Sequence, residues 1–186
     1  MRLFTGITLS KQAQDAVSKA QETLRSAVHC SKWQSIKTLH ITLHFLGECE
    51  EGRIAGIQES LRANIEKFPP FSLSIGPLGI FGRPSSPRVL WLGLQGDVSM
   101  LQDIQKHTAE VLRKLGVYDE NKPYHPHLTL GREVKDDFNL SEAQQLVGEF
   151  SSVAWQVDHI CLFKSELLRT GAVHTVIGEY QLQDQA

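Results

Sequence analysis

The sequence has few cysteines, and they follow no metal-binding or redox pattern. Cys30, Cys49 and Cys161 are scattered along 186 residues without a C-x-x-C spacing. An odd set of isolated cysteines argues against a disulfide framework and indicates free thiols in a reducing compartment. We therefore predict a cytoplasmic protein. Its fold needs no covalent staple, because a chain of this length can bury a large core.

Long hydrophobic runs are also missing. No stretch approaches 18 consecutive apolar residues, so no membrane-spanning helix is predicted. The N-terminal MRLFTGITLSKQ lacks the apolar length and the cleavage site of a secretory signal. The net charge is −2 and the pI is near 6.4, which disfavours a broad basic surface for long nucleic acids. A small pocket for a single anionic group remains compatible with that charge.

Hydrophobic periodicity predicts interleaved strands and helices. The sequence places Trp33 in a loop, and it predicts that GIFGRPSSP forms a long turn or flexible loop because glycine, proline and serine are frequent there. A short helix is expected to begin at Ser141, which has capping-box spacing to Gln144. Strands are expected at 2–9, 38–46, 71–76, 87–94, 127–133, 155–163 and 173–180, and helices at 11–28, 50–68 and 100–116.

The spacing of these elements predicts the fold class. Neighbouring strands are close enough in sequence to form hairpins, which favours an α+β fold with antiparallel sheets over a doubly wound parallel sheet. Each half of the chain offers helices and one strand with the pattern His-x-Thr-Leu. We therefore predict two pseudo-symmetric lobes, each with an antiparallel sheet and helices, within a single domain over residues 1–186.

The repeated pattern is the strongest functional signal in the sequence. HITL begins at His40 and HLTL begins at His127. Given the composition, chance predicts roughly 0.05 occurrences of His-x-Thr-Leu. A single His-x-Thr on a strand with one solvent-facing side needs no functional explanation, but two copies do. Because residues two apart share a strand face, each strand is expected to present a His–Thr pair: His40 with Thr42, and His127 with Thr129.

Two such pairs suit phosphoryl chemistry. Histidine can give or take a proton near neutral pH, so two histidines can supply one general acid and one general base. The threonine hydroxyls can hydrogen-bond phosphoryl oxygens, and in-line displacement requires acid and base on opposite sides of the phosphorus. Arg132 would add a fixed cation if a bulge near Gly131 turned it towards His127.

A metal-based alternative can be stated from the same residues. His44 and His125 are expected on the same faces as His40 and His127, and four histidines around a cleft could hold zinc. However, neither motif strand carries a carboxylate or cysteine on its histidine face, and the threonines would then have no role. We therefore predict no metal and no cofactor, and we expect His44 and His125 either to support the residues that contact the substrate or to be packing groups.

The sequence resembles the two-histidine (2H) phosphoesterases, and more closely the RNA 2′,3′-cyclic phosphodiesterases, also called 2′-5′ RNA ligases. The resemblance rests on RLFTGI, LHITLHFLGE, PRVLWLGL and NKPYHPHLTLGRE, in the family's order and over nearly the whole chain. It implies a bilobal fold with an active-site cleft between two antiparallel sheets. It also implies metal-independent opening of RNA or nucleotide 2′,3′-cyclic phosphates to 2′-phosphates, in some members with 2′-5′ ligation.

The resemblance also implies residue roles. His40 would be the general acid and His127 the general base, although the two could be exchanged; Thr42, Thr129 and Arg132 would bind the phosphate. Near the C-terminus the chain keeps the family's Ser165 and Gly171 but has Ala172 and His174 in place of proline and tyrosine.

Aromatic residues suggest where a base could stack. We consider Tyr124, Phe81 and Trp33 as stacking candidates, whereas Trp91 is expected in the core. The partners implied are RNA ends or nucleotides that carry a cyclic phosphate, bound by a monomer without membrane contact. The alternatives are a phosphodiesterase for another small phosphate ester and a non-catalytic module that binds RNA ends.

Overall fold

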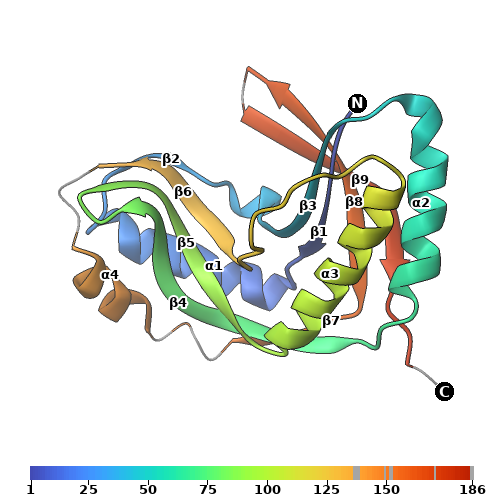
Figure 1. Cartoon of the computed structure of the whole chain (residues 1–186). Coiled ribbons are helices and arrows are strands. Elements are labelled where there is room, and N and C mark those ends of the chain that lie inside the picture. The colour runs from blue at the N-terminus through green and yellow to red at the C-terminus, as the bar shows by residue number, and fades with distance from the viewer. Residues whose placement is uncertain (136–138, 149, 151–152, 170, 185–186) are drawn as a thin grey trace.

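The computed structural model describes residues 1–135, 139–148, 150, 153–169 and 171–184. Two antiparallel sheets and four α-helices make up this part of the chain, as the predicted α+β class requires (Figure 1). No helix in these ranges is long and apolar enough to cross a bilayer. The strands are β1 (Arg2–Thr8), β2 (Cys30–Trp33), β3 (His40–Glu48), β4 (Phe71–Arg83), β5 (Ser86–Gly96), β6 (Leu128–Val134), β7 (Ala154–Val157), β8 (His159–Leu168) and β9 (Gly171–Gln181). The helices are α1 (Lys11–Arg25), α2 (Glu51–Ile65), α3 (Val98–Lys114) and α4 (Leu140–Val147), with a short 3₁₀ turn at Ile36–Thr38.

The two sheets define the two lobes. The first sheet has the strand order β3-β1-β8-β9, and the second has the order β2-β6-β5-β4-β7. Helices α2 and α3 pack against the first sheet, whereas α1 and α4 pack against the second. The lobes are not the two halves of the chain, because β8 and β9 return to pair beside β1 and because α1 follows β1 but covers the other sheet. Each sheet therefore contains one motif strand, as predicted, but the two lobes do not correspond to the first and second halves of the sequence.

Amphipathic patterning accounts for helix α1. Its buried residues recur at helical spacing and include Ala13, Val17 and Leu24. The Ser10 hydroxyl caps the helix by accepting a hydrogen bond from the backbone nitrogen of Ala13 at 3.2 Å, and serine is a residue type that the N-cap position favours. Helix α4 is capped differently. The side chain of Asn139 accepts from the backbone nitrogens of Ser141 and Glu142, so the expected cap at Ser141 is wrong by two residues.

The predicted loop at residues 79–87 is the largest correction to the element boundaries. Most of it continues β4 and begins β5, so that the connection shrinks to a tight turn after Arg83. Within the predicted loop, Gly82 accompanies a register shift between Phe81 and Gly82, and Pro84 lies in the turn. A further register shift lies between Ile75 and Leu78, before the predicted loop. Proline and glycine are tolerated in strands at such irregularities. The loop expected around Trp33 is also wrong, because this residue ends strand β2.

Candidate active site

A cavity of about 430 Å³ collects all five residues that the motif analysis predicts for catalysis and phosphate binding. His40 and Thr42 come from β3. His127, Thr129 and Arg132 come from β6 and the residue before it. The cavity therefore lies where the two motif strands approach each other from different sheets, which is the placement expected from the sequence. The remaining lining residues are Arg2, Leu3, Phe4, Gln34, Thr38, Leu39, Phe45, Ser165, Leu167, Ala172 and His174.

Both motif strands carry the same irregularity just after the threonine. In β3, Thr42 pairs with Gly6 of β1 while His44 pairs with Thr5, so Leu43 is an extra residue. In β6, Thr129 pairs with Trp91 while Gly131 pairs with Leu90, so the extra residue is Leu130. A bulge of this kind reverses the facing of the residues that follow it.

These bulges decide which side chains reach the cavity. The fifth residue after the first motif histidine is Phe45 and the fifth after the second is Arg132, and both line the cavity. Without the bulges, both would point to the opposite face. The sequence anticipated a bulge for Arg132, but the extra residue lies one position before the suggested Gly131. It did not anticipate the bulge in β3, so the prediction that His44 shares a face with His40 is wrong.

Each bulge is held by a side chain from another part of the chain. The hydroxyl of Tyr124 donates to the carbonyl of Thr42 at 3.0 Å. The side-chain amide of Gln21, which is 4% exposed on α1, donates to the carbonyl of Leu130 at 3.0 Å and to that of Gln34 at 2.9 Å. The carbonyl of Leu130 also accepts from the backbone nitrogen of Gln34 at 2.8 Å, so the amide of Gln21 bonds both partners of this contact. Gln21 and Tyr124 therefore fix the backbone that carries the motif side chains.

We expect Gln21→Leu to reduce kcat/KM about tenfold and the free energy of unfolding by about 1–2 kcal/mol, since two buried hydrogen bonds are lost. The matched control is Gln14→Leu, which removes a similar bond from α1 to the carbonyl of Leu9 at 3.0 Å, away from the bulge. This control should retain full activity. Turnover and urea denaturation measure both variants, and an equal loss of activity in the two would contradict a role for Gln21 in placing Arg132.

Both motif histidines hold Nδ1 in a hydrogen bond to a backbone carbonyl, which leaves Nε2 for a ligand in the cavity. Nδ1 of His40 lies 2.8 Å from the carbonyl of Thr38, and Nδ1 of His127 lies 2.7 Å from the carbonyl of His125. A carbonyl only accepts hydrogen bonds, so each Nδ1 carries a proton and donates it. Each neutral ring therefore keeps Nε2 free as a base, and each protonated ring offers Nε2–H as an acid.

The surroundings favour neutral imidazoles in the free protein. Burial, with smaller contributions from the nearby His174, His127 and Arg132, lowers the pKa of His40 from 6.5 to about 4. Burial also lowers the pKa of His127, with smaller contributions from His125 and Arg132. An anionic ligand would offset these effects, because it favours the protonated form of both rings.

We expect the kcat/KM profile against pH to be bell-shaped, with its maximum below pH 6.5. The kcat/KM profile reports the ionisation of the free protein, in which the two histidines together must carry one proton. Above the higher of their two pKa values this proton is lost and the rate falls. The pair gains a second proton below the lower value, near pH 4. Initial rates with a cyclic nucleotide at subsaturating concentration measure this profile. A rate that keeps rising to about pH 9 would exclude titrating histidines.

The cavity is suited to an anion although the whole chain is slightly acidic. Its described lining contains Arg2, Arg132 and three histidines but no aspartate or glutamate. The hydroxyls of Thr42, Thr129 and Ser165 add hydrogen-bond donors that a phosphate oxygen can use. The two arginines therefore supply positive charge beside these donors, as the small anion pocket considered from the sequence requires.

The three stacking candidates occupy different positions, and none of them lines the cavity. The Phe81 ring lies 4.8 Å from that of His127, nearly perpendicular to it, and therefore supports this histidine from behind. Tyr124 is partly buried with its hydroxyl engaged by Thr42. Trp33 is covered on one face by the guanidinium of Arg25, 4.7 Å from the ring centre. Stacking of a base on any of them remains a proposal.

The other singled-out aromatic and histidine residues have packing roles. Trp91 pairs with Thr129 across β5 and β6, and its ring lies 4.7 Å from that of His125. It is only partly buried, so it belongs to the wall behind His127 more than to the core. His44 is 1% exposed, and its two ring nitrogens lie 2.7 Å from the Thr5 hydroxyl and 3.0 Å from the carbonyl of Gln105. The four-histidine zinc site is therefore not assembled.

The sequence missed an aromatic group on the first lobe. Phe4 of β1 stacks on Phe163 of β8 with ring centres 4.7 Å apart, and Phe45 lies 6.0 Å from Phe4. His40 and His174 pack against the same ring at 4.6 and 5.0 Å. Phe45 is 63% exposed, and an exposed phenyl ring beside a cavity is a surface on which a base or ribose can pack. Phe45 reaches the cavity because of the bulge in β3, and residue spacing in the sequence does not predict that bulge.

A bilobal α+β fold with two His–Thr strands across one cleft defines a two-histidine phosphoesterase architecture. The chain belongs to the 2′-5′ RNA ligase superfamily, whose sequence profile matches residues 11–168. It is 33% identical over 185 residues to an RNA 2′,3′-cyclic phosphodiesterase of Methanothermobacter thermautotrophicus, covering 98% of this chain and 99% of the relative. It is 31% identical to the protein of the same name from Thermotoga maritima, covering 98% and 96% of the two chains.

Solved structures support the fold. The chain superposes on TT0787 of Thermus thermophilus with a TM-score of 0.79 and 22% identity over the full length of both chains. It superposes on E. coli LigT in complex with 3′-AMP with a TM-score of 0.77 and 21% identity over 98% of each. The relatives' names are those of hydrolases, and the chain is an enzyme of this class.

Proposed function

We propose that the enzyme hydrolyses 2′,3′-cyclic phosphates at the end of an RNA or on a nucleotide, leaving a 2′-phosphate, without a metal ion. The observation that carries this proposal is the cavity lined by both His–Thr pairs and by Arg132. The names of the Methanothermobacter and Thermotoga relatives support the substrate class. The two imidazoles supply acid and base, and the described lining contains no carboxylate or thiolate to anchor a metal beside them.

The proposed reaction is an in-line displacement at phosphorus. Nε2 of His127 accepts a proton from water as the water oxygen bonds to phosphorus. The bond from phosphorus to the 3′ oxygen breaks on the opposite side, and Nε2–H of His40 gives its proton to that oxygen. The product keeps the phosphate on the 2′ oxygen. The ring of His127 then loses its proton to solvent and that of His40 regains one.

Phosphate binding is assigned to three residues. The hydroxyls of Thr42 and Thr129 donate to phosphoryl oxygens, and the guanidinium of Arg132 stabilises the charge that spreads over these oxygens in the transition state. The same anion raises the pKa of His40 once substrate is bound, so that this histidine can carry the proton it must deliver.

Ligation follows from the same step with a different nucleophile. If a 5′-hydroxyl of another RNA end replaces water, departure of the 3′ oxygen leaves a 2′-5′ linkage. The match to the 2′-5′ RNA ligase superfamily favours this second reaction. Adding an oligonucleotide with a free 5′-hydroxyl to the hydrolysis assay tests it, because a longer product should then appear.

The decisive experiment identifies the product isomer. Chelator-treated protein is incubated with nucleoside 2′,3′-cyclic phosphates, and the products are separated by chromatography and assigned by phosphorus NMR. A 2′-phosphate is the expected result. A 3′-phosphate would overturn the identity of the leaving oxygen. Nucleotide binding without turnover would favour an RNA-end binding module, and loss of activity on chelation would contradict the metal-free mechanism.

A further inference from the structure

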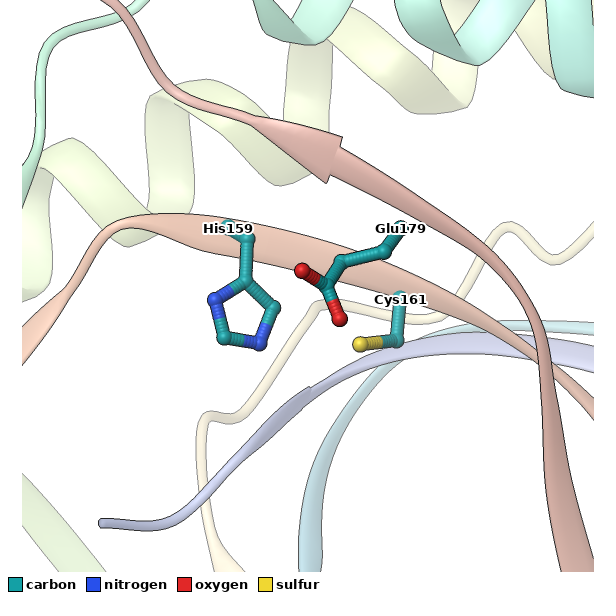
Figure 2. Close-up of side chains that lie close together, drawn as sticks. All are labelled: His159, Cys161 and Glu179. Atoms are coloured by element: carbon teal, nitrogen blue, oxygen red, sulfur yellow. The ribbon is translucent and has the colours of Figure 1, made fainter.

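A second cluster of reactive side chains lies on the first sheet outside the cavity. His159 and Cys161 are two residues apart on β8 and share one face of the strand. Glu179 of β9 is the direct partner of Cys161 in the sheet. Figure 2 shows the three side chains converging, with one ring nitrogen of His159 on the side of the sulfur and the carboxylate. One donor atom from each residue lies within 4.8 Å of the others.

The histidine in this cluster is held in one orientation. Nδ1 of His159 lies 2.5 Å from a carboxylate oxygen of Asp158, and Nε2 lies 3.2 Å from the hydroxyl of Thr8. The ring therefore donates from Nδ1 to a carboxylate and accepts at Nε2 from the Thr8 hydroxyl, a hydrogen bond that an ion bound at Nε2 would replace. A carboxylate behind a histidine is the usual outer support of a zinc-bound imidazole, because it fixes the ring and increases its basicity.

The exposure of the three residues is graded from the sheet outward. Cys161 is 1% exposed and His159 is half-buried, whereas Glu179 is exposed. An ion could therefore enter from solvent past the exposed Glu179 carboxylate, one oxygen of which accepts a hydrogen bond from the side-chain amide of Gln181 at 3.0 Å. One imidazole, one thiolate and one carboxylate form a mixed set that suits the borderline-soft Zn²⁺ ion.

We propose that His159 Nε2, Cys161 Sγ and a carboxylate oxygen of Glu179 form a zinc-binding site, with water as fourth ligand and Asp158 orienting the histidine. Bonds of about 2.0–2.3 Å require the donors to draw together by roughly 1 Å. This requires small rotations of the three side chains, and the ion replaces the hydrogen bonds that Gln181 makes to Glu179 and Thr8 makes to His159. Zinc replaces the thiol proton, which passes to solvent. Burial, together with the Glu179 carboxylate, raises the pKa of Cys161 to about 12, so the thiol keeps this proton until an ion displaces it.

The proposed site is separate from the active site. None of the three ligands lines the cavity. Thr8 pairs with His40 in the sheet and bonds His159 through its hydroxyl, so His159 lies two strands from His40, roughly 10 Å away. Zinc bound here would connect β8 to β9 and stabilise the folded chain by mass action. The two proposals can therefore fail separately. Hydrolysis by chelator-treated protein tests the proposed function, whereas zinc binding can be measured on protein that has no activity.

The test is a zinc titration of the purified, chelator-treated full chain against a chromophoric competitor, with thermal unfolding followed in parallel. We expect one tightly bound equivalent and a rise in Tm with zinc. His159→Ala, Cys161→Ser and Glu179→Gln should each weaken binding about tenfold or more, and Asp158→Asn should also weaken it. Substituting Co²⁺ should give a thiolate-to-metal absorption band that Cys161→Ser removes.

Matched controls are a histidine and a cysteine elsewhere. His107→Ala and Cys30→Ser should bind zinc like the parent chain, as should the double variant His40→Ala/His127→Ala. If the double variant loses zinc while the ligand variants keep it, the ion binds in the catalytic cavity and the proposal is overturned. Absence of a stoichiometric equivalent overturns it as well. Glu179→Gln changes an exposed side chain, so it keeps the test decisive if a β8 variant fails to fold.

Discussion

Replacing either motif histidine with alanine is expected to lower kcat for cyclic-phosphate hydrolysis by about 10²–10⁴-fold. His40 and His127 line the cavity with Nδ1 bonded to a carbonyl and with no hydrogen bond to Nε2 from the described residues, and a positioned acid or base contributes about this much. The double variant should lose little more than the worse single variant, because the two act in one step. Steady-state rates and thermal unfolding of all three variants measure this. His107→Ala, whose ring contacts Asn64 and Phe68 on the α2 side, is the matched control and should be fully active.

The same variants can assign the two roles. A 4-nitrophenyl nucleotide diester has a leaving group that needs no proton, so a chain that lacks the general acid should recover on it. We expect His40→Ala to recover and His127→Ala to remain impaired. The opposite pattern would exchange the acid and base while leaving the pair intact. Equal impairment on both substrates, with unchanged folding, would mean that neither histidine donates to the leaving oxygen.

Arg132→Ala is expected to lower kcat/KM by about 10²-fold, and Arg132→Lys should recover only part of it. A guanidinium binds two phosphate oxygens at fixed geometry, whereas an ammonium is a single point charge. Arg132 also lowers the pKa of both His40 and His127. Its removal should therefore shift the kcat/KM profile to higher pH, which a merely structural defect would not do.

The control for Arg132 is Arg88→Ala. Arg88 is exposed on the neighbouring strand β5 and does not line the cavity, so its loss changes the net charge equally and should leave both the rate and the pH profile in place. Competitive inhibition by inorganic phosphate provides a second measurement. It should weaken in Arg132→Ala and remain in Arg88→Ala; equal inhibition of the two would remove Arg132 from the phosphate site.

The sequence predicted the features that follow from hydrophobic periodicity along the chain. It could not predict the features that depend on which residues pair between neighbouring strands. The H-x-T spacing was enough to bring His40, Thr42, His127 and Thr129 to one cavity, because residues two apart share a strand face. The bulge at Leu43 is a property of its register with β1, and it moved His44 into the core and Phe45 to the cavity. Residue types alone carry no record of that register.

The support of the site was equally hidden from the sequence. Gln21 lies on a helix that the pattern reads as merely amphipathic, yet its amide holds the second motif strand. Tyr124 was considered as a stacking residue because it precedes the second motif, but its hydroxyl holds the first. Contacts between residues so far apart in the chain depend on the tertiary fold, and a short segment of sequence does not determine them.

The paired bulges make the two walls of the candidate active site chemically different. The two His–Thr pairs alone are nearly twofold, since each wall offers a histidine, a threonine and an extra leucine. The bulges then bring a phenyl ring to one wall and a guanidinium to the other. A nucleoside phosphate has one end that is uncharged and aromatic and one that is anionic, so turning it end over end would place charge against Phe45 and a base against Arg132. We therefore expect the cleft to distinguish two orientations of a substrate that its histidines alone could not tell apart.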